Sequence, residues 1–182
     1  SDEFGVPVFT GNDANVAALA ETMRGAAVVY KNVIYITVST GIGGGIITDS
    51  HLLLGQSGLG AEIGHLVMIV GDQVSSLEKE AAGPSLARKL RRRIEAGAAS
   101  EIISDIIGND LSQIDGKVVG EAALKGDSNA LEVVQQGAHI LGLGVVSLLH
   151  VFNPEIVVLG GGVVFGLRDK ILDPMRATIE KH

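Results

Sequence analysis

Residues 33–48 read VIYITVSTGIGGGIIT, and this stretch decides the class of fold. Its first part, Val33–Ser39, is rich in β-branched residues, which favour an extended strand. Glycines crowd the turn at Thr40–Gly45, and Gly45–Thr48 resumes as a strand, so the stretch predicts a β-hairpin. Glycine lets a backbone come close to a ligand and turn its amide groups toward an anion. We therefore interpret the turn as a phosphate loop rather than a plain tight turn.

The context of this loop excludes two common nucleotide motifs. A dinucleotide-binding loop needs G-x-G-x-x-G followed by a helix, whereas Gly41–Gly45 leads back into a strand. A Walker A loop needs Gly-Lys-Ser/Thr, which does not follow here. A hairpin with Thr40 and Gly41 at its tip instead resembles the phosphate-holding hairpin of actin-like and hexokinase-like ATPases.

Helical patterns and short apolar runs alternate along the rest of the chain. A helix is expected from Asp13 to about Arg24, where Gly25 ends it. A long buried helix is expected from about 129 to 150, where Asn153-Pro154 stops it. Other expected helices are 77–82, 85–96, 101–107, 118–125 and one from about 167, and other β-like runs are 6–10, 65–70 and 155–159. The early hairpin and the late helix–strand–helix unit indicate an α/β protein.

Composition excludes several classes of protein. The 182 residues are 46% hydrophobic with a mean hydropathy of +0.37, which suits a compact core. The net charge of -7 argues against a general nucleic-acid binder, and we interpret the basic cluster Lys89–Arg93 as a solvated helix face. Without cysteine, neither disulfides nor thiolate metal sites are expected. The start is no signal peptide, and the apolar run Ile140–Phe152 is too short to span a bilayer, so we expect a cytoplasmic protein without a membrane partner.

A polar cluster, Asn12-Asp13-Ala14-Asn15, precedes the first expected helix. Asp or Asn can cap this helix by accepting hydrogen bonds from its unpaired amide groups. A carboxylate at a helix N-terminus is also held rigid and kept ionised by the helix dipole. Asp13 is therefore a candidate general base as well, which would accept a proton from an attacking sugar hydroxyl in phosphoryl transfer. The two roles are compatible.

Two further segments carry side chains that suit the hydroxyl groups of a ligand. Gly60–His65 offers Glu62 and His65, and a carboxylate accepts hydrogen bonds while an imidazole can donate them. Glu-x-x-His is half of a di-iron helix motif, but a second copy is absent and Gly64 argues against a helix. A structural histidine is the simpler interpretation of His65. For Glu78, at an expected helix start, the simpler interpretation is a solvent-facing acid that favours the helix dipole.

The motifs follow one order along the chain: Asn12–Asn15, Thr40–Gly45, Gly60–His65, Leu77-Glu78 with Gly83, and Leu159–Gly162. In this order the chain resembles the glucokinases and related sugar kinases of the ROK family (repressors, open reading frames, kinases). The similarity covers nearly the whole chain, and the five motifs together are specific for the family but not for the sugar. The resemblance implies an α/β lobe of the actin-like or hexokinase-like ATPase type (ribonuclease H-like). Such a lobe has a mixed sheet, flanking helices and a long central helix.

The resemblance also implies a role for each motif. The catalytic base that deprotonates the sugar hydroxyl would be Asp13. The residues that bind a hexose would be Asn12, Asp13, Glu62, His65 and Glu78. The second phosphate loop would contain Thr40, Gly41 and Gly43, and the contacts to the adenosine of ATP would be Gly161 and Gly162. Mg²⁺ would accompany the ATP. Family members are commonly homodimers through this lobe, so a homodimer is expected.

The chain departs from the family pattern in three places. The family usually places a Cys-x-Cys-x₄-Cys zinc cluster after the histidine, but Gly71–Ser76 has no cysteine, so we expect no zinc and a less fixed His65. No Asp-x-Gly-x-Thr phosphate loop precedes Asn12. Residues 1–182 are therefore expected to be a single C-terminal lobe without its N-terminal lobe, and a poor or inactive kinase alone. The end also looks short, because the family usually continues past the helix at Ile179.

Three functions stay open on the sequence. The first is an ATP-dependent hexose kinase, catalytic when its first lobe is supplied. The second is the sugar-sensing domain of a ROK-type transcriptional repressor, which needs no chemistry and carries a winged helix instead of the first lobe. The third is a non-catalytic dimerising lobe, which the loss of the cysteines favours. Retention of Asp13 beside Asn12 favours the kinase over the sensor, and retention of all five sugar-site residue types counts against the third function.

Overall fold

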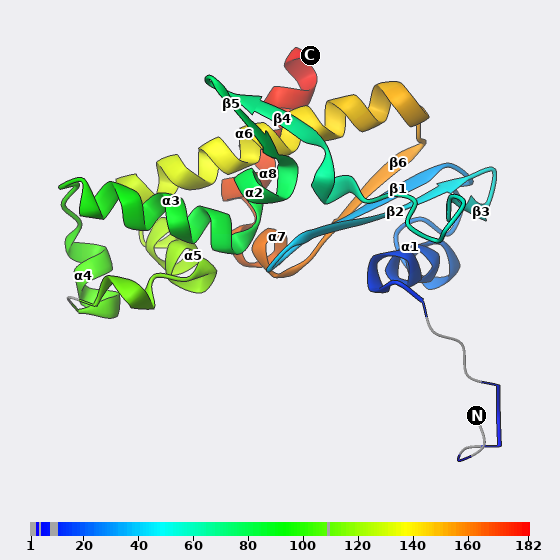
Figure 1. Cartoon of the computed structure of the whole chain (residues 1–182), viewed down its shortest axis with the longest axis horizontal. Helices are drawn as coiled ribbons and strands as arrows, with labels where there is room; N and C mark the ends of the chain where they lie inside the picture. Colours follow the sequence, from blue (N-terminus) through cyan, green and yellow to red (C-terminus); the bar gives the residue numbers. More distant parts are fainter. Residues whose placement is uncertain (1–2, 4, 8–10, 109) are drawn as a thin grey trace.

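The computed structural model describes residues 3, 5–7, 11–108 and 110–182, and its centre is a mixed four-stranded sheet (Figure 1). The strands are β1 Val33–Val38, β2 Ile42–Thr48, β3 His51–Leu52 and β6 Ile156–Gly160, in the order β3-β2-β1-β6. β1 and β2 are antiparallel, with Val38 opposite Ile42, and form the predicted hairpin. β6 lies parallel to β1, with Ile36 opposite Leu159, which makes the sheet mixed.

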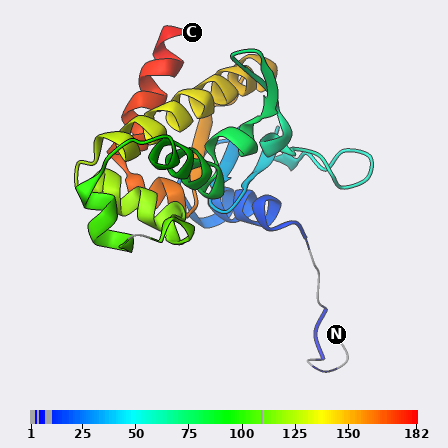
Figure 2. The same cartoon turned by 60° about the vertical axis from the view of Figure 1, so that its left-hand side comes forward.

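Helices lie on both faces of this sheet (Figures 1 and 2). They are α1 Asp13–Arg24, α2 Leu77–Ala81, α3 Gly83–Glu95, α4 Glu101–Ile107, α5 Gly116–Leu124, α6 Ser128–Phe152, α7 Gly162–Leu167 and α8 Asp169–Lys181. Successive side chains of a strand point to opposite faces. Ile34 and Ile36 of β1 therefore join Leu141 of α6 in the main core, whereas Val33 joins Ala18 of α1 in a smaller cluster on the other face.

Helix α6 is the long central helix that the sequence predicts. By length and composition it is apolar enough to cross a membrane, yet 56% of the qualifying 18-residue window is buried inside the protein. It packs against α2, α3, α5 and α8. Its apolar surface is therefore largely that of a core helix, as the sequence analysis expects of residues 140–152.

A second, two-stranded hairpin lies apart from the main sheet, near α6 (Figure 1). Its strands are β4 Val67–Val70 and β5 Gln73–Ser76, joined at Gly71, whose φ is +57°. The expected run 65–70 starts later because residues Ile63–His65 form a 3₁₀ helix. No strand was expected at 73–76. This segment has one apolar residue, Val74, among polar ones, so it shows no alternation of apolar and polar residues that would indicate a strand.

Three other expectations differ from the structure. The expected turn at Thr40–Gly45 is shorter, because Gly43, Gly44 and Gly45 belong to strand β2. The helix expected from about 167 is α8, and a further helix that was not expected, α7, precedes it; the two meet at Arg168 with a φ of +47°. The strand expected at 6–10 falls largely on residues 8–10, which lie outside the described residues.

Candidate functional site

Helix α1 brings Asn12 and Asp13 to the start of strand β2. The Asn12 Oδ1 atom caps the helix by accepting hydrogen bonds from the amides of Ala14, at 3.0 Å, and Asn15, at 3.2 Å. The helix lies directly on the strand because β2 has glycines there: a Cβ atom added at Gly45 would lie 2.6 Å from the Ala18 Cβ atom. The side chains of both motif residues are exposed at the helix end, as a ligand-binding pair must be.

Glu78 lies against the other side of the same hairpin. Its Oε2 atom accepts a hydrogen bond from the Ile42 amide at 2.9 Å. A Cβ atom added at Gly41 would lie only 2.6 Å from that oxygen, so a side chain there would displace the Glu78 carboxylate from its present position. Ser76 caps the helix that carries Glu78, through a hydrogen bond from the Lys79 amide to its hydroxyl at 3.3 Å. The half-buried carboxylate is thus fixed to the hairpin. The simpler interpretation of Glu78, a solvent-facing acid, does not describe it.

Glu62 precedes the short 3₁₀ helix that packs on β2, and His65 is its last residue. Gly64, between them, is buried, and a Cβ atom added there would collide with the Ile42 carbonyl oxygen. Ile63 fills the space above Gly44, where an added Cβ atom would overlap its side chain. Both Glu62 and His65 remain exposed. The local fold therefore brings the Gly60–His65 motif to Ile42, which is also the residue that Glu78 contacts.

The hairpin tip touches the two later glycine segments. The Ser39 carbonyl accepts a hydrogen bond from the Gly83 amide at 2.9 Å. Gly161 has a φ of +94°, and a Cβ atom added there would collide with the Val38 carbonyl oxygen, so only glycine suits this position. Thr40 and Gly162 are exposed and line one cavity. Gly41 and Gly43 do not line it, so of the residues proposed for ATP only Thr40 and Gly162 face this cavity.

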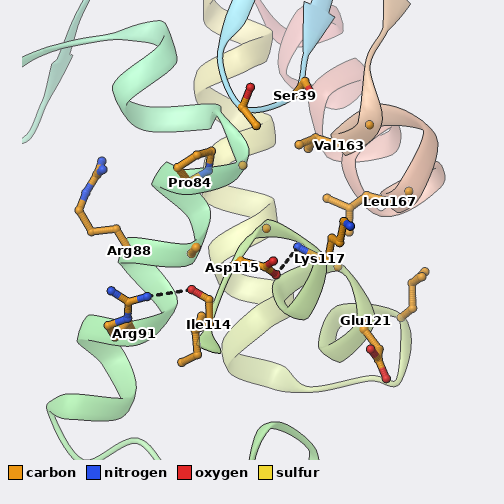
Figure 3. Close-up of a pocket in the computed structure, with 18 of the residues that line it drawn as sticks. Ser39, Pro84, Arg88, Arg91, Ile114, Asp115, Lys117, Glu121, Val163 and Leu167 are labelled. Carbon is orange, nitrogen blue, oxygen red and sulfur yellow. Dashed lines mark hydrogen bonds between the residues drawn. The ribbon is translucent and has the colours of Figure 1, made fainter. Parts of the chain in front are cut away.

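This cavity has a volume of about 950 Å³ and lies between the hairpin tip, α3, α5 and α7 (Figure 3). Pro84, Val163 and Leu167 form apolar walls beside Ser39 (Figure 3). Its size is that of a pocket for a small molecule or a cofactor. At one edge of the cavity the backbones of α3 and α5 lie in close contact. A Cβ atom added at Gly116 would lie 3.2 Å from the Gly83 Cα atom.

Charged side chains around the cavity were missed by the sequence analysis. They are Arg88, Arg91, Asp115, Lys117, Glu121 and Lys125. Arg91 donates a hydrogen bond to the carbonyl of Leu111 at 3.0 Å. It donates another to the carbonyl of Ile114 at 2.9 Å, which Figure 3 shows. The only available signal was the i, i+3 spacing of Arg88 and Arg91 on a helix, which does not distinguish a cavity wall from a solvated face.

The basic cluster Lys89–Arg93 is therefore not simply a solvated helix face. Arg91 is half-buried against backbone carbonyls, Lys89 forms an ion pair with Glu80 at 2.7 Å, and Arg93 binds the carboxylate of Glu132. The expectation was wrong because tertiary neighbours, which a linear pattern does not reveal, supply partners to these long side chains.

Metal-binding side chains do not gather in the described residues: no three His, Cys, Asp or Glu side chains there lie together as a metal site. The segment 71–76, where the family pattern has cysteines, forms the turn and second strand of the β4–β5 hairpin. Backbone pairing, such as Ile69 with Val74, organises this segment.

The whole chain, residues 1–182, matches the family described as the ROK family. The glucokinase of Thermotoga maritima is 35% identical over 93% of this chain and 57% of its own length. A putative xylose repressor of a Caldicellulosiruptor species is 30% identical over 98% of this chain and 45% of its own length. The chain spans about half the length of the curated relatives that it matches.

Solved structures show the same fold. A ROK family glucokinase from Streptomyces griseus, in complex with glucose and AMPPNP, is 33% identical with a TM-score of 0.87, covering 99% of this chain and 60% of the glucokinase. A ROK family transcriptional regulator, a homologue of the E. coli MLC protein, is 28% identical with a TM-score of 0.85, covering 99% of this chain and 45% of the regulator. The predicted α/β lobe of the hexokinase-like, actin-like ATPase type is confirmed.

Proposed function

Because the chain belongs to the ROK family, we propose that it supplies the sugar site, the catalytic base and the second phosphate loop of an ATP-dependent hexose kinase. One observation carries this proposal: a single hairpin, β1–β2, connects the residues proposed to bind ATP with those proposed to bind the sugar. Thr40, at its tip, lines the large cavity, and Ile42, two residues later, binds Glu78. A kinase needs such an arrangement, because the sugar hydroxyl must meet the terminal phosphate of ATP.

In the proposed mechanism Asp13 is the general base. Its Oδ1 atom accepts a hydrogen bond from the Ala14 amide at 2.8 Å, which fixes the carboxylate and leaves Oδ2 for the sugar hydroxyl. ATP supplies the phosphoryl group, and positioning and charge neutralisation provide most of the catalysis. The backbone at exposed Thr40 and half-buried Gly41 would hold phosphate oxygens, and the cavity beside Gly162 would hold the adenosine.

The sugar would be read by donors and acceptors that the fold leaves unused. The Asn12 Oδ1 atom caps α1, so its amide nitrogen is left to donate to a hydroxyl. The Glu78 Oε2 atom binds Ile42, so Oε1 is left to accept. Glu62 and His65 add an acceptor and a donor from the 3₁₀ turn. A hexose is proposed because the Streptomyces griseus glucokinase, crystallised with glucose, has this fold at 33% identity.

Mg²⁺, a homodimer and a cytoplasmic location complete the proposal. Mg²⁺ is bound mainly by substrate phosphates and water in kinases, which agrees with the lack of a three-ligand cluster among the described residues. Light scattering during gel filtration tests the dimer. A mass near twice that of one chain supports it, and the mass of one chain contradicts it.

A sugar sensor without catalysis is the second candidate function. It is favoured by the likeness to the ROK family transcriptional regulator, whose TM-score of 0.85 is close to that of the glucokinase. The sensor would use the same sugar residues, whereas Asp13 would only bind the sugar. The two candidates therefore differ in chemistry and not in ligand class.

Calorimetric titration of the chain with a panel of hexoses tests the shared part of both candidates. Binding that Glu78→Ala abolishes supports the site, and absence of heat with every hexose contradicts it. Hexose-dependent release of ADP, measured on a protein that joins this lobe to a first lobe, then separates the kinase from the sensor. ADP release that Asp13→Asn abolishes supports the kinase, and binding without ADP release supports the sensor.

A further inference from the structure

We propose that a second cavity, between helices α3 and α6, binds a small phosphate-bearing anion. This cavity has a volume of about 380 Å³ and is separate from the larger one. Its polar lining comes from Lys89, Arg92 and Arg93 of α3 and from Gln136 and His139 of α6, with Glu80 of α2 at one end. The volume is at the lower end of the range for small-molecule pockets and suits an anion of modest size.

Helical spacing explains why these side chains meet in one place. Residues 89, 92 and 93 are related as i, i+3 and i+4, so they share one face of α3. Residues 136 and 139 are related as i and i+3 and share one face of α6, which packs against α3 (Figure 1). Arg88 and Arg91 lie on the other side of α3 and line the larger cavity. Helix α3 is thus a wall between two cavities and presents basic side chains to each.

The charges in the second cavity do not balance. Lys89 pairs with Glu80 at 2.7 Å, and an Arg93 nitrogen lies 2.9 Å from a Glu132 oxygen. Burial acts to raise the pKa of Glu80, but hydrogen bonds from Lys89 and Ser75 outweigh it and keep the pKa below its ordinary value, so this carboxylate is charged at neutral pH. Within the described part of the chain, Arg92 has no carboxylate at ion-pair distance. One positive charge is left for a ligand.

Two residues that line the cavity, Arg93 and His139, each keep one nitrogen without a hydrogen-bond partner among the described residues. The Arg93 Nε atom is buried and has no hydrogen-bond partner among the described residues, which is rare for a buried donor and calls for an explanation. The Thr178 hydroxyl donates to the Pro174 carbonyl at 3.0 Å, so it accepts from His139 Nδ1, 3.0 Å away. The second ring nitrogen of a neutral His139 is then an acceptor, which suits a protonated oxygen of a ligand.

The arrangement of these donors indicates the class of ligand. Arginine forms bidentate hydrogen bonds with phosphate as well as with carboxylate. Here the donors lie on two helices on either side of the cavity, and a phosphate offers acceptor oxygens in several directions, whereas a carboxylate offers them in one plane. A phosphate group therefore satisfies Arg92 of α3 together with Gln136 of α6 better than a carboxylate does, and Arg93, whose terminal nitrogens bind Glu132, lines the cavity beside them.

Titration calorimetry with two probes, inorganic phosphate and glycerol 3-phosphate, tests this site. We expect Arg92→Gln to weaken binding of at least one probe by about tenfold, the usual loss for one charged hydrogen bond. Lys117→Gln, which removes a cation of the larger cavity, is the matched control and should leave the affinity unchanged. Tighter binding of glycerol 3-phosphate than of phosphate identifies a phosphate ester as the ligand, and equal binding identifies the free ion.

Two results overturn the proposal. One is the absence of heat with both probes at millimolar concentration. The other is binding that Lys117→Gln weakens and Arg92→Gln does not, which places the anion in the larger cavity. Arg92 is exposed, so its variant is expected to fold, and an unchanged unfolding midpoint verifies this. Gln136→Leu is a second variant and should weaken the same probe. The outcome does not depend on whether the protein phosphorylates a sugar.

Discussion

Glu78 and Ile42 are joined by a hydrogen bond of 2.9 Å, from the backbone amide of the hairpin to the Oε2 atom of the carboxylate. This bond connects helix α2 to Ile42, which lies within the proposed phosphate loop. Since only one carboxylate oxygen is used, Glu78 is able to hold the hairpin and accept a hydrogen bond from a sugar at the same time. Its two roles can therefore be separated by substitution.

Glu78→Ala should reduce both the stability and the sugar affinity. It leaves the Ile42 amide unpaired in a partly buried place, which costs about 1–3 kcal/mol of unfolding free energy. Glu78→Gln keeps an oxygen for the Ile42 amide but presents a donor instead of an acceptor to the sugar. We expect Gln to restore most of the stability and little of the affinity, as measured by urea unfolding and calorimetry. Equal hexose affinity in the wild type and both variants contradicts a sugar contact at Glu78.

Glycine at position 64 should be required for packing, in contrast to glycine at position 166. An added Cβ atom at Gly64 collides with the Ile42 carbonyl oxygen, which is backbone and moves with difficulty. We expect Gly64→Ala to destabilise the protein by about 1–3 kcal/mol through overpacking. An added Cβ atom at Gly166 meets nothing within 4 Å, so Gly166→Ala in helix α7 should stabilise by about 0.4–1 kcal/mol. Thermal unfolding of both variants measures this, and equal shifts contradict it.

Local signals explain which elements could be predicted from the sequence. The bounds of α1 and α4 were predicted correctly, because Asn12 and Ser100 cap them and a glycine follows each. Helix α7 was missed because its first residue, Gly162, belongs to a run of three glycines that indicates a loop. Position 161 needs glycine because the chain after β6 lies directly on the Val38 carbonyl. This contact joins segments more than a hundred residues apart in the sequence, so no local pattern predicts it.

The candidate site was predictable where its residues form short motifs. Asn12, Glu62 and Glu78 come from such motifs, and the structure brings all three motifs to strand β2. The glycine-rich stretch was interpreted too simply. Gly44 and Gly45 make room for Ile63 and Ala18, so their pattern reports packing on both sides of β2 rather than phosphate contact. The walls of the large cavity come from separate helices, and no linear pattern connects them.

Asn12 should contribute to stability through its cap and to ligand binding through its amide group. Asn12→Ala removes the cap acceptor of the Ala14 and Asn15 amides, of which Ala14 keeps Asp13, and should cost about 0.5–2 kcal/mol of unfolding free energy. Asn12→Asp keeps a good cap, so its stability should stay near that of the wild type. It lacks the side-chain nitrogen, however, and should bind the hexose more weakly. Urea unfolding and calorimetry on the two variants test this, and a hexose affinity unchanged in Asn12→Asp contradicts a role of Asn12 in sugar binding.

Glu155 should make the stability of the sheet depend on acid pH. Its Oε2 atom accepts hydrogen bonds from the backbone amides of Asn32, at 2.8 Å, and Lys31, at 2.7 Å, and so ties the segment before β1 to the start of β6. These bonds hold the pKa of Glu155 below its ordinary value of 4.5. A group with a lowered pKa in the folded state stabilises the protein fully above its unfolded pKa, and this stabilisation is lost as the pH falls through the folded pKa.

Urea unfolding of the wild type and of Glu155→Gln over a range of pH measures this contribution. We expect the wild type to be the more stable of the two at neutral pH, because glutamine accepts the two amide bonds without a charge. The difference should be constant down to a pH of about 4.5 and should shrink as the wild-type carboxylate is protonated below it. Glu180→Gln, an exposed change in α8, is the matched control and should show no such convergence. A difference between wild type and Glu155→Gln that stays constant down to a pH of about 3 contradicts the assignment, because an ionised Glu155 would then not be the source of the stability.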